Sequence, residues 1–381
     1  MYAPVLNSDP TAKAREVFST SLGIPICAED TPHIGGTAAF FFSVTHHPGK
    51  LFLLTARHVL FHPDDEPNEL YVYRGIGDKK RDVLLLGDEG FEQRVKLIES
   101  QIEDRVTMID YHHRRMNATD KMADKEGAEK ERRDAAYQLE KENDSKVALE
   151  EFLVEVKRDW GEKGNRVIGH VVLSPPIRFN VGNRGHTQDW AVIEIDTSKV
   201  DETNFLRNCI DLDPSIDVTT FTKWMYPHLT SPHSFTYPEN RLLDIFGTLS
   251  DKEMQKPDPK FVDQHQDPVI MVVKNGANSG VTVGRLNTIA SFIRLYFTGK
   301  PGDWSREVAV LPRDSKSGPF SHKGDSGSAV VAGDGKLAGL LIGGTGSSGV
   351  SDCAYVTSID AILEGLEASD YKANLCPTFA P

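Results

Sequence analysis

Cysteine is scarce in this sequence. Only four occur in 381 residues, and no two of them form a Cys-x-x-Cys pair. The chain also opens without a basic segment followed by an apolar one, so we read no secretory signal. Because disulfides persist mainly in oxidising compartments, we predict a cytoplasmic location and reduced, mostly buried thiols at Cys27, Cys209, Cys353 and Cys376.

Long apolar runs and excess positive charge are also lacking. No apolar run approaches the roughly 18 residues that a membrane span needs. Lysine and arginine number 43 against 56 aspartates and glutamates, which gives a formal net charge of -13. That balance argues against a surface for nucleic acid or an anionic membrane, so we expect neither partner.

Metal-binding patterns are missing as well. There is no His-Glu-x-x-His motif. The pairs His46-His47 and His112-His113 are better explained as surface residues than as ligands. We therefore expect no metal and no cofactor.

Short apolar segments separated by glycine, proline and aspartate run through most of the chain. This pattern is typical of an all-β barrel or sandwich. In the first half we expect strands over Gly36 to Val44, Leu51 to His58, Tyr71 to Tyr73, Val83 to Leu86, Val167 to Leu173 and Trp190 to Ile195. In the second half we expect strands over Val269 to Val273, Val281 to Ile289, Phe292 to Phe297, Val308 to Leu311, Ala329 to Val331, Leu337 to Ile342 and Ala354 to Thr357. Asn275-Gly276 predicts a hairpin turn between the first two of these.

One segment breaks the strand pattern. From Phe91 to Trp160 there is no proline, and apolar residues recur at steps of three, four and seven, as in a coiled coil. One straight helix of 70 residues would span about 105 Å and could not return to the flanking strands. The midpoint lies beside Gly127, so we predict an inserted antiparallel helical hairpin. Its tip should be charged and exposed, and its base should bury an apolar seam that includes Ile98, Ile102, Leu153 and Val156.

These patterns divide the chain into five parts. We expect an N-terminal extension over 1–30 and a first barrel over 31–199 that contains the hairpin insertion at 91–160. A stretch rich in proline and aspartate, 200–268, should link it to a second barrel and closing helix over 269–366, and a tail should follow over 367–381.

A Gly-Asp-Ser-Gly-Ser run occupies Gly324 to Ser328. A serine hydroxyl is a poor nucleophile at neutral pH, so it needs a base, a group that orients the base, and donors for the oxyanion. No histidine follows Ser326, so any base must precede it in the chain. This excludes the Ser-Asp-His order of α/β-hydrolases and leaves the order His, Asp, Ser. A plain β-turn is the alternative explanation of the run.

His58 and Asp189 are the candidates for the base and its orienting group. His58 ends an apolar strand, and the pKa of imidazole lies near the working pH of a base. Asp189 immediately precedes an alternating strand and could accept the other imidazole N–H. A core histidine and an aspartate in an ordinary turn are the alternatives. Asp82 and Asp88 are weaker rivals of Asp189.

With Thr55-Ala56-Arg57-His58 early and Gly-Asp-Ser-Gly late, the sequence resembles the trypsin-like serine peptidases of the chymotrypsin fold, the PA clan. It looks closer still to intracellular trypsin-like peptidase-domain proteins of fungi. The resemblance implies a mainly β fold of two antiparallel β-barrels with an active site in the cleft between them. It also implies that His58, Asp189 and Ser326 are the catalytic triad. The backbone N–H groups of Gly324 and Ser326 would form the oxyanion hole.

The resemblance covers roughly residues 31–365, except the insertion and part of the linker. His58 and Asp189 are 131 residues apart, against about 45 in the chymotrypsin template. Without the 70-residue insertion 61 remain, so the insertion accounts for most of the excess. Asp189 and Ser326 are 137 residues apart, against about 93 in the template, and the linker can absorb this difference.

The resemblance further implies a substrate-binding strand after the nucleophile, at Leu340 to Gly344. An extended peptide would add to this edge through main-chain hydrogen bonds. The implied substrate-binding residues are Phe320, Ile342, Gly343, Gly344 and Cys353. Core glycines in a hairpin are the alternative explanation of the two glycines. No aspartate occupies the pocket-base position of trypsin, so tryptic specificity is not expected.

Ile34-Gly35-Gly36 is similar to the activated N-terminus of secreted trypsins. It lies only 24 residues before His58, when counted from Ile34, and Gly36 already opens a strand, so we interpret the run as a turn. Asp325 would then lack the N-terminal amine that is its usual partner. The pattern resembles members of the fold that are made without a zymogen.

These observations lead to one expected function and one alternative. We expect a serine endopeptidase that hydrolyses protein or peptide substrates through an acyl-enzyme. The alternative is a catalytically weak or inactive scaffold of the same fold that recruits protein partners through the helical hairpin.

Overall fold

The computed structural model describes residues 1–75, 77–200, 203, 205–226, 233, 235–263, 265–297, 300–345 and 353–377. The chain forms two compact units. One contains Met1–Pro4, Glu16–Gly87 and the chain from Val167 onward, and the other contains Val5–Arg15 and Asp88–Arg166.

Six antiparallel strands close into the first barrel. In order around it they are β1 (Pro25–Ala28), β5 (Asp82–Leu85), β6 (Val167–Ser174), β9 (Ala191–Ile195), β3 (Phe52–Thr55) and β2 (Gly35–Val44), which pairs back with β1. Two short strands, β4 (Tyr71–Val72) and β20 (Ala373–Asn374), pair with β6 and β2. Successive side chains of a strand point to opposite faces, yet Phe40, Phe41 and Phe42 of β2 are all fully buried. Both faces of β2 are therefore covered.

A second ring of six strands forms the other barrel. It runs through β13 (Ile270–Gly276), β14 (Gly280–Leu286), β16 (Lys300–Pro312), β19 (Ala354–Ser358), β18 (Lys336–Gly344) and β17 (Ala329–Ala332), and closes on β13. The strand β15 (Ser291–Phe297) pairs with β16, and β12 (Gly247–Thr248) pairs in parallel with β18. The predicted mainly β fold of two antiparallel barrels with an inserted helical hairpin is confirmed.

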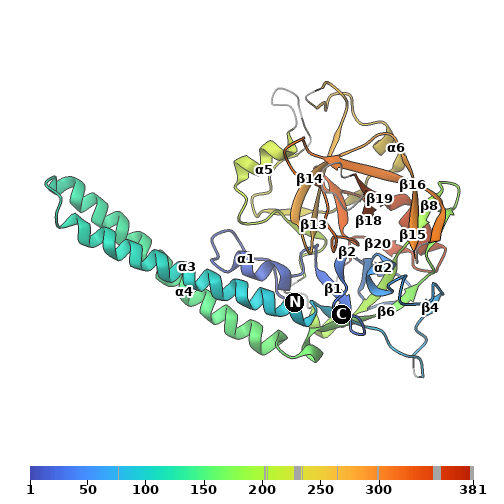
Figure 1. Ribbon diagram of the computed structural model, residues 1–381, viewed down its shortest axis with the longest axis horizontal. Coiled ribbons are helices and arrows are strands. Elements are labelled where there is room, and N and C mark those ends of the chain that lie inside the picture. Colours follow the sequence, from blue (N-terminus) through green and yellow to red (C-terminus); the bar gives the residue numbers. More distant parts are fainter. Residues whose placement is uncertain are drawn as a thin grey trace. The chain divides into compact units, whose positions relative to one another are not determined.

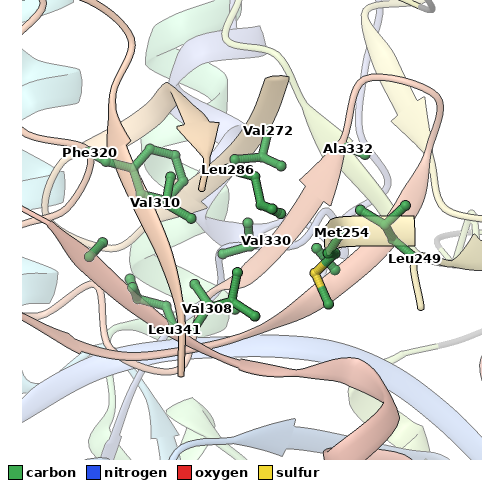
Figure 2. Close-up of a cluster of buried hydrophobic side chains, with 13 residues drawn as sticks. Leu249, Met254, Val272, Leu286, Val308, Val310, Phe320, Val330, Ala332 and Leu341 are labelled. Atoms are coloured by element: carbon green, nitrogen blue, oxygen red, sulfur yellow. The ribbon is translucent and has the colours of Figure 1, made fainter. Parts of the chain in front are cut away.

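Apolar side chains from the strands of the second ring form one buried cluster together with Leu249, Met254 and Phe320, which lie outside these strands (Figure 2). Val272, Leu286, Val310, Phe320 and Val330 are each at most 3% exposed. Burying a large apolar side chain contributes about 1.5–3 kcal/mol, so this cluster is a main source of the stability of the ring.

The stretch 200–268, which we expected to link the two barrels, contains, besides β12, four short helices and strands among its described residues. These are β10 (Cys209–Asp211), α5 (Val218–Met225), β11 (Leu242–Asp244) and α6 (Asp251–Gln255). The strands β10 and β11 pair with each other, and a buried bidentate ion pair joins Arg241 to Asp211. Each element is short, so its periodicity is too weak to stand out in the sequence.

The remaining elements are a small hairpin and several short helices. The strands β7 (Arg178–Val181) and β8 (His186–Gln188) form a separate two-stranded sheet. The α-helices are α1 (Ala12–Arg15), α2 (Arg57–Leu60) and α7 (Ile359–Glu367), and 3-10 turns cover η1 (Glu16–Phe18), η2 (Lys163–Arg166) and η3 (Thr197–Lys199).

The helical unit is built on α3 (Asp88–Thr119) and α4 (Lys125–Trp160), which lie side by side as an antiparallel pair (Figure 1). Its buried positions follow a seven-residue repeat, which keeps one seam of each helix against the other. On α3 they include Phe91, Ile98, His112 and Thr119, and on α4 Ala135, Leu149 and Val156. Arg105 and Glu142 occupy the remaining positions of the same seven-residue repeats and form an ion pair with each other at 2.9 Å.

Two details of the predicted hairpin differ from the structure. Ile98 and Val156 are buried, but Ile102 and Leu153 are only half-buried, because the seam follows the repeat through Ile98 and Val156 instead. The helices are separated at 120–124, and Asp124 caps α4 by accepting from the N–H of Glu126. Gly127 is half-buried in the first turn of α4, where a Cβ would lie 2.4 Å from Asp124 Oδ2.

The predicted turn at Asn275-Gly276 is wrong. Both residues lie in β13, paired with Val281 and Gly280 of β14, so the chain turns two residues later. The side chain of Asn275 is buried and donates to Leu22 O (3.2 Å). Glycine is needed at 276 because a Cβ there would lie 2.4 Å from Asp325 Oδ1.

Candidate active site

The candidate base and its orienting carboxylate lie together. The ladder of β3 ends at Thr55, and His58 stands in the short helix α2 rather than at the end of a strand as predicted. Its Nδ1 lies 2.6 Å from Asp189 Oδ2, and its backbone N–H donates to Asp189 Oδ1 at 3.0 Å. Because the chain leaves β3 at Thr55 and enters α2 at Arg57, the backbone N–H of His58 has no strand partner and donates to the carboxylate instead.

Burial and charge oppose each other at this pair. Asp189 is 1% exposed, and the side chain of His58 is 21% exposed. Burial alone would lower the pKa of His58, but the Asp189 carboxylate outweighs that effect and the net pKa is raised above its ordinary value. This arrangement holds the proton on Nδ1 and leaves Nε2 as the basic atom.

Arg57 anchors the helix that carries His58. Its guanidinium is buried and donates to Ser174 O (2.9 Å), Ser174 Oγ (2.8 Å) and Glu69 O (2.7 Å). Burial lowers its pKa to about 10, against the opposing effect of Asp189. Arg57 thus ties the start of α2 to Ser174 of β6 and to the backbone of Glu69.

The loop Gly324–Ser328 packs against the two residues that precede α2. Gly324 and Gly327 both have positive φ angles, +97° and +89°, a region that favours glycine. A Cβ on Gly327 would lie 2.1 Å from Thr37 O and 3.2 Å from the backbone N of Ala56. No larger residue fits there, so glycine permits the close approach of the loop to the first barrel.

Thr37 of β2 holds the same loop from the other barrel. Its N–H donates to Ser326 O (2.9 Å), and its Oγ1 donates to Gly324 O (3.0 Å). Thr55 Oγ1 in turn donates to Thr37 O (2.7 Å). These bonds connect the loop to the strand end from which the chain enters α2.

The amides of Gly324 and Ser326 are available to a ligand. Across the residues that the structure describes, neither N–H donates to a protein acceptor. Such paired donors are what an oxyanion requires. Across the same residues, no hydrogen bond joins the Ser326 hydroxyl to His58, and catalytic hydrogen bonds often tighten only once substrate is bound.

Asp325, next to the candidate nucleophile, is the centre of a buried charge network. Lys274 Nζ lies 3.1 Å from its Oδ2, and both side chains are 0% exposed. Its carboxylate also accepts from the N–H groups of Asn278 (3.1 Å), Ser279 (3.0 Å) and His322 (2.8 Å). Burial works against a charge on Asp325, but Lys274 and these donors outweigh it and lower its pKa.

Lys274 is the residue that sequence reasoning missed. Its ammonium group is a cationic partner of Asp325, whereas Ile34-Gly35-Gly36 had led us to expect only that an N-terminal amine is lacking there. Gly35 and Gly36 lie inside the paired strand β2, and the turn precedes them, where the N–H of Ile34 donates to Thr31 O. A charged residue in the apolar strand Val272-Val273-Lys274 was the signal that could have revealed this partner.

The implied substrate residues divide into two groups. Phe320 is 1% exposed and belongs to the core cluster of the second ring, and its assignment to a substrate pocket stays a prediction. Gly343 is half-buried with open space where a Cβ would be. Ile342 forms a bulge in the pairing of β18 with β19, and Gly344 lies beside Cys353, whose carbonyl would be 3.2 Å from a Cβ.

The two weaker rivals of Asp189 lie elsewhere in the structure. Asp82 lies on β5 with Lys80 at 3.3 Å, and Asp88 begins α3 in the helical unit. No group of three or more histidine, cysteine, aspartate or glutamate residues within the described ranges could hold a metal. No helix in the same ranges is long and apolar enough to cross a membrane.

Comparisons with known proteins give structural likenesses only. No family model and no curated protein sequence matches the chain. A glutamic acid specific serine protease has a TM-score of 0.39 and 13% identity over 92% of this chain and 97% of its own. Nocardiopsis protease has a TM-score of 0.39 and 10% identity over 92% and 97%, and Thermobifida fusca protease A has 0.40 and 9% over 92% and 96%. All three similarities are at low sequence identity, between 9% and 13%.

Proposed function

We propose that this protein is a serine endopeptidase that cleaves peptide bonds through Ser326, His58 and Asp189. The observation that carries the proposal is the double contact of Asp189 with His58, at 2.6 Å to the ring and 3.0 Å to the backbone. Two contacts fix both the position and the tautomer of the imidazole, which a surface ion pair would not do. The loop Gly324–Ser328, in which the N–H groups of Gly324 and Ser326 have no acceptor among the described residues, supplies the second half of the site.

The first half of the proposed reaction forms an acyl-enzyme. Ser326 Oγ attacks the carbonyl carbon of the scissile peptide, and His58 Nε2 takes the hydroxyl proton. The carbonyl π-electrons move to oxygen, and the N–H groups of Gly324 and Ser326 bind that oxyanion. The carbonyl then reforms, the C–N bond breaks, and the imidazolium gives its proton to the leaving amine.

The second half repeats the chemistry with water. His58 takes a proton from water, which attacks the ester carbon, and the same two amides bind the new oxyanion. The C–O bond to Ser326 breaks, and His58 returns the proton to Ser326 Oγ. Asp189 stays ionised throughout and stabilises the imidazolium that forms in each half.

An extended peptide is the substrate class that fits the edge of β18. Leu341 still bonds to the loop before β17, since it donates to Ser328 O (3.0 Å) and accepts from Gly327 N–H (2.8 Å). Beyond Leu341 the strand makes no further pairing on that side among the described residues, while Gly343 and Gly344 still pair with β19 on the other side. A substrate strand could therefore add to the free edge through main-chain hydrogen bonds. The absence of a Cβ at Gly343 leaves room for a substrate side chain.

The pH dependence of hydrolysis tests the role of Asp189. Since the pKa of His58 is raised above 6.5 and only neutral imidazole can act as base, activity should rise with pH with a midpoint above 6.5. In Asp189→Asn the burial of His58 is no longer opposed, so the midpoint should move lower. The plateau should fall by about 10⁴-fold, because the tautomer is no longer held.

The measurement is kcat/KM on a fluorogenic peptide across pH 5 to 9. Asp82→Asn is the matched control, since it changes an aspartate on β5 that has a lysine neighbour. An Asp189→Asn variant with the rate and midpoint of the parent protein would remove Asp189 from the mechanism.

The scaffold alternative has one observation in its favour. Several large apolar side chains of the hairpin are exposed, among them Tyr137 at 65% and Val154 at 66%. Such residues could serve as contacts for a protein partner, although single exposed apolar residues are common on surfaces.

A variant with a shorter helical hairpin distinguishes the proposed peptidase function from the scaffold function. The contacts of Arg105 with Glu142 and Arg115 with Glu131 show which positions face each other, so residues 110–137 can be replaced by a short turn. We expect the shortened chain to hydrolyse small peptides at the parental rate, because the helical pair is a compact unit of its own. Loss of small-peptide hydrolysis by a folded, shortened chain would show that the hairpin is required for catalysis.

A further inference from the structure

The hairpin β7–β8 connects the second barrel to Asp189. Asp189 directly follows β8 and precedes β9 of the first barrel, while the hairpin belongs to neither barrel sheet. Three hydrogen bonds attach it to β16: Arg306 N–H to Gly185 O (2.8 Å), Asn180 N–H to Ser305 Oγ (3.1 Å), and Thr187 N–H to Glu307 Oε1 (2.7 Å). The segment that enters Asp189 is therefore anchored on the second barrel.

His186, three residues before Asp189, lies between two carboxylates. Its side chain is 6% exposed, with Nδ1 3.5 Å from Glu307 Oε2 and Nε2 3.8 Å from Asp251 Oδ2. Burial opposes a charge on this ring, but Asp251 and Glu307 outweigh that effect and raise the pKa of His186 to about 9. His186 is consequently a cation at neutral pH.

Glu307 is a fully buried carboxylate next to His186. Its side chain is 0% exposed, and beyond Thr187 N–H it accepts only from Thr357 Oγ1 (3.0 Å) among the described residues. A buried carboxylate without a cation is strongly destabilising.

The other charges around His186 are mostly satisfied elsewhere. Arg184, in the turn of the hairpin, binds Asp251 as well as Asp360 (3.0 Å) and Glu364 (2.9 Å) of α7. Arg306 lines a small cavity together with His186, Asp251 and Glu307. Arg184 thus balances the carboxylates of α6 and α7, and the ion-pair partner of Glu307 is His186.

We propose that His186 and Glu307 are a positioning pair that clamps hairpin β7–β8 onto β16 and so aims the Asp189 carboxylate at His58. Any effect of this pair on kcat rests on the proposed function, whereas its effect on the contact between His58 and Asp189 does not. The clamp is complete below pH 6.5, where His186 is protonated even in the unfolded chain. It is lost as the pH rises through about 9, because Glu307 is then buried beside a neutral ring.

The test compares His186→Gln with Arg178→Gln, which removes an exposed cation from the same hairpin. In the full-length chain, NMR follows the titration of His58 and the downfield signal of its Nδ1 proton. We expect His186→Gln to lower the His58 pKa and weaken that signal. We also expect kcat to fall about 10- to 100-fold with little change in KM, since a small misplacement of a catalytic group has effects of this size. Arg178→Gln should match the parent.

A second measurement covers the case in which His186→Gln fails to fold. In the unmodified protein, the Nδ1 proton signal of His58 should weaken between pH 8 and 10 as His186 loses its proton. A signal that is constant through pH 10, or a folded His186→Gln with parental His58 titration, would overturn the proposal. A parent protein without hydrolase activity would refute the proposed function, while the NMR result would still decide on the clamp.

Discussion

Replacing Ser326 by alanine should abolish peptide hydrolysis and leave the fold intact. The hydroxyl is the proposed nucleophile, and removal of a triad member lowers kcat by about 10⁴-fold or more. The side chain is half-buried and makes no hydrogen bond within the described residues, so the change removes little packing. The bond from Thr37 N–H to Ser326 O uses the backbone and remains.

Ser328→Ala is the matched control in the same run of sequence. Its hydroxyl is buried and donates to Asp325 O at 2.6 Å, so its loss should lower the free energy of unfolding by about 1 kcal/mol. Hydrolysis should remain measurable, because this serine points into the loop. Turnover of a fluorogenic peptide measures the activity of both variants, and thermal unfolding measures their stability. Parental activity in Ser326→Ala would exclude Ser326 as the nucleophile.

Replacing Lys274 by methionine should disable the site without touching any reacting group. Methionine keeps the apolar stem but leaves the Asp325 carboxylate buried without its cation, which costs about 3–5 kcal/mol. The structure can relieve this by turning Asp325 toward solvent. That movement would carry Gly324 and Ser326 with it and misplace the oxyanion donors, a loss of about 10²–10³-fold in kcat.

The double variant Lys274→Met with Asp325→Asn tests this explanation. A neutral amide can still accept from the N–H groups of Asn278 and Ser279, so stability should recover in part relative to Lys274→Met. Chemical denaturation gives the stability, and peptide hydrolysis gives the activity. If Lys274→Met were as stable and active as the parent, the ion pair would have no part in holding the loop.

The helical hairpin could be predicted because its sequence periodicity extends over many residues. Seventy residues of helical spacing predicted the hairpin, and the polar pair Arg105–Glu142 within the seam did not obscure it. Asn275-Gly276 was misread because a two-residue turn signal is also compatible with a strand. Only the tertiary contact of Gly276 with Asp325 explains the glycine.

Some residues of the candidate site could be predicted from the sequence, and others could not. Ser326 and His58 lie in short motifs, so their candidacy was visible in the sequence. Lys274 could not be assigned as the partner of Asp325, because the two are 51 residues apart and only the folding of β13 against the loop brings them together. The burial of Phe320 in the core cluster could not be predicted, because a position relative to a motif does not reveal how deeply a side chain is buried.

The most direct test of the central claim is covalent labelling of the full-length protein with a fluorophosphonate, located by mass spectrometry of its peptides. A serine reacts with this reagent only when a base and an oxyanion site activate it. We predict one adduct, on Ser326. Its rate of formation should rise with pH through a midpoint above 6.5, and no adduct should form in His58→Ala. An unlabelled Ser326 in the folded parent protein, or equal labelling in His58→Ala, would contradict the assignment of Ser326, His58 and Asp189 as a catalytic triad.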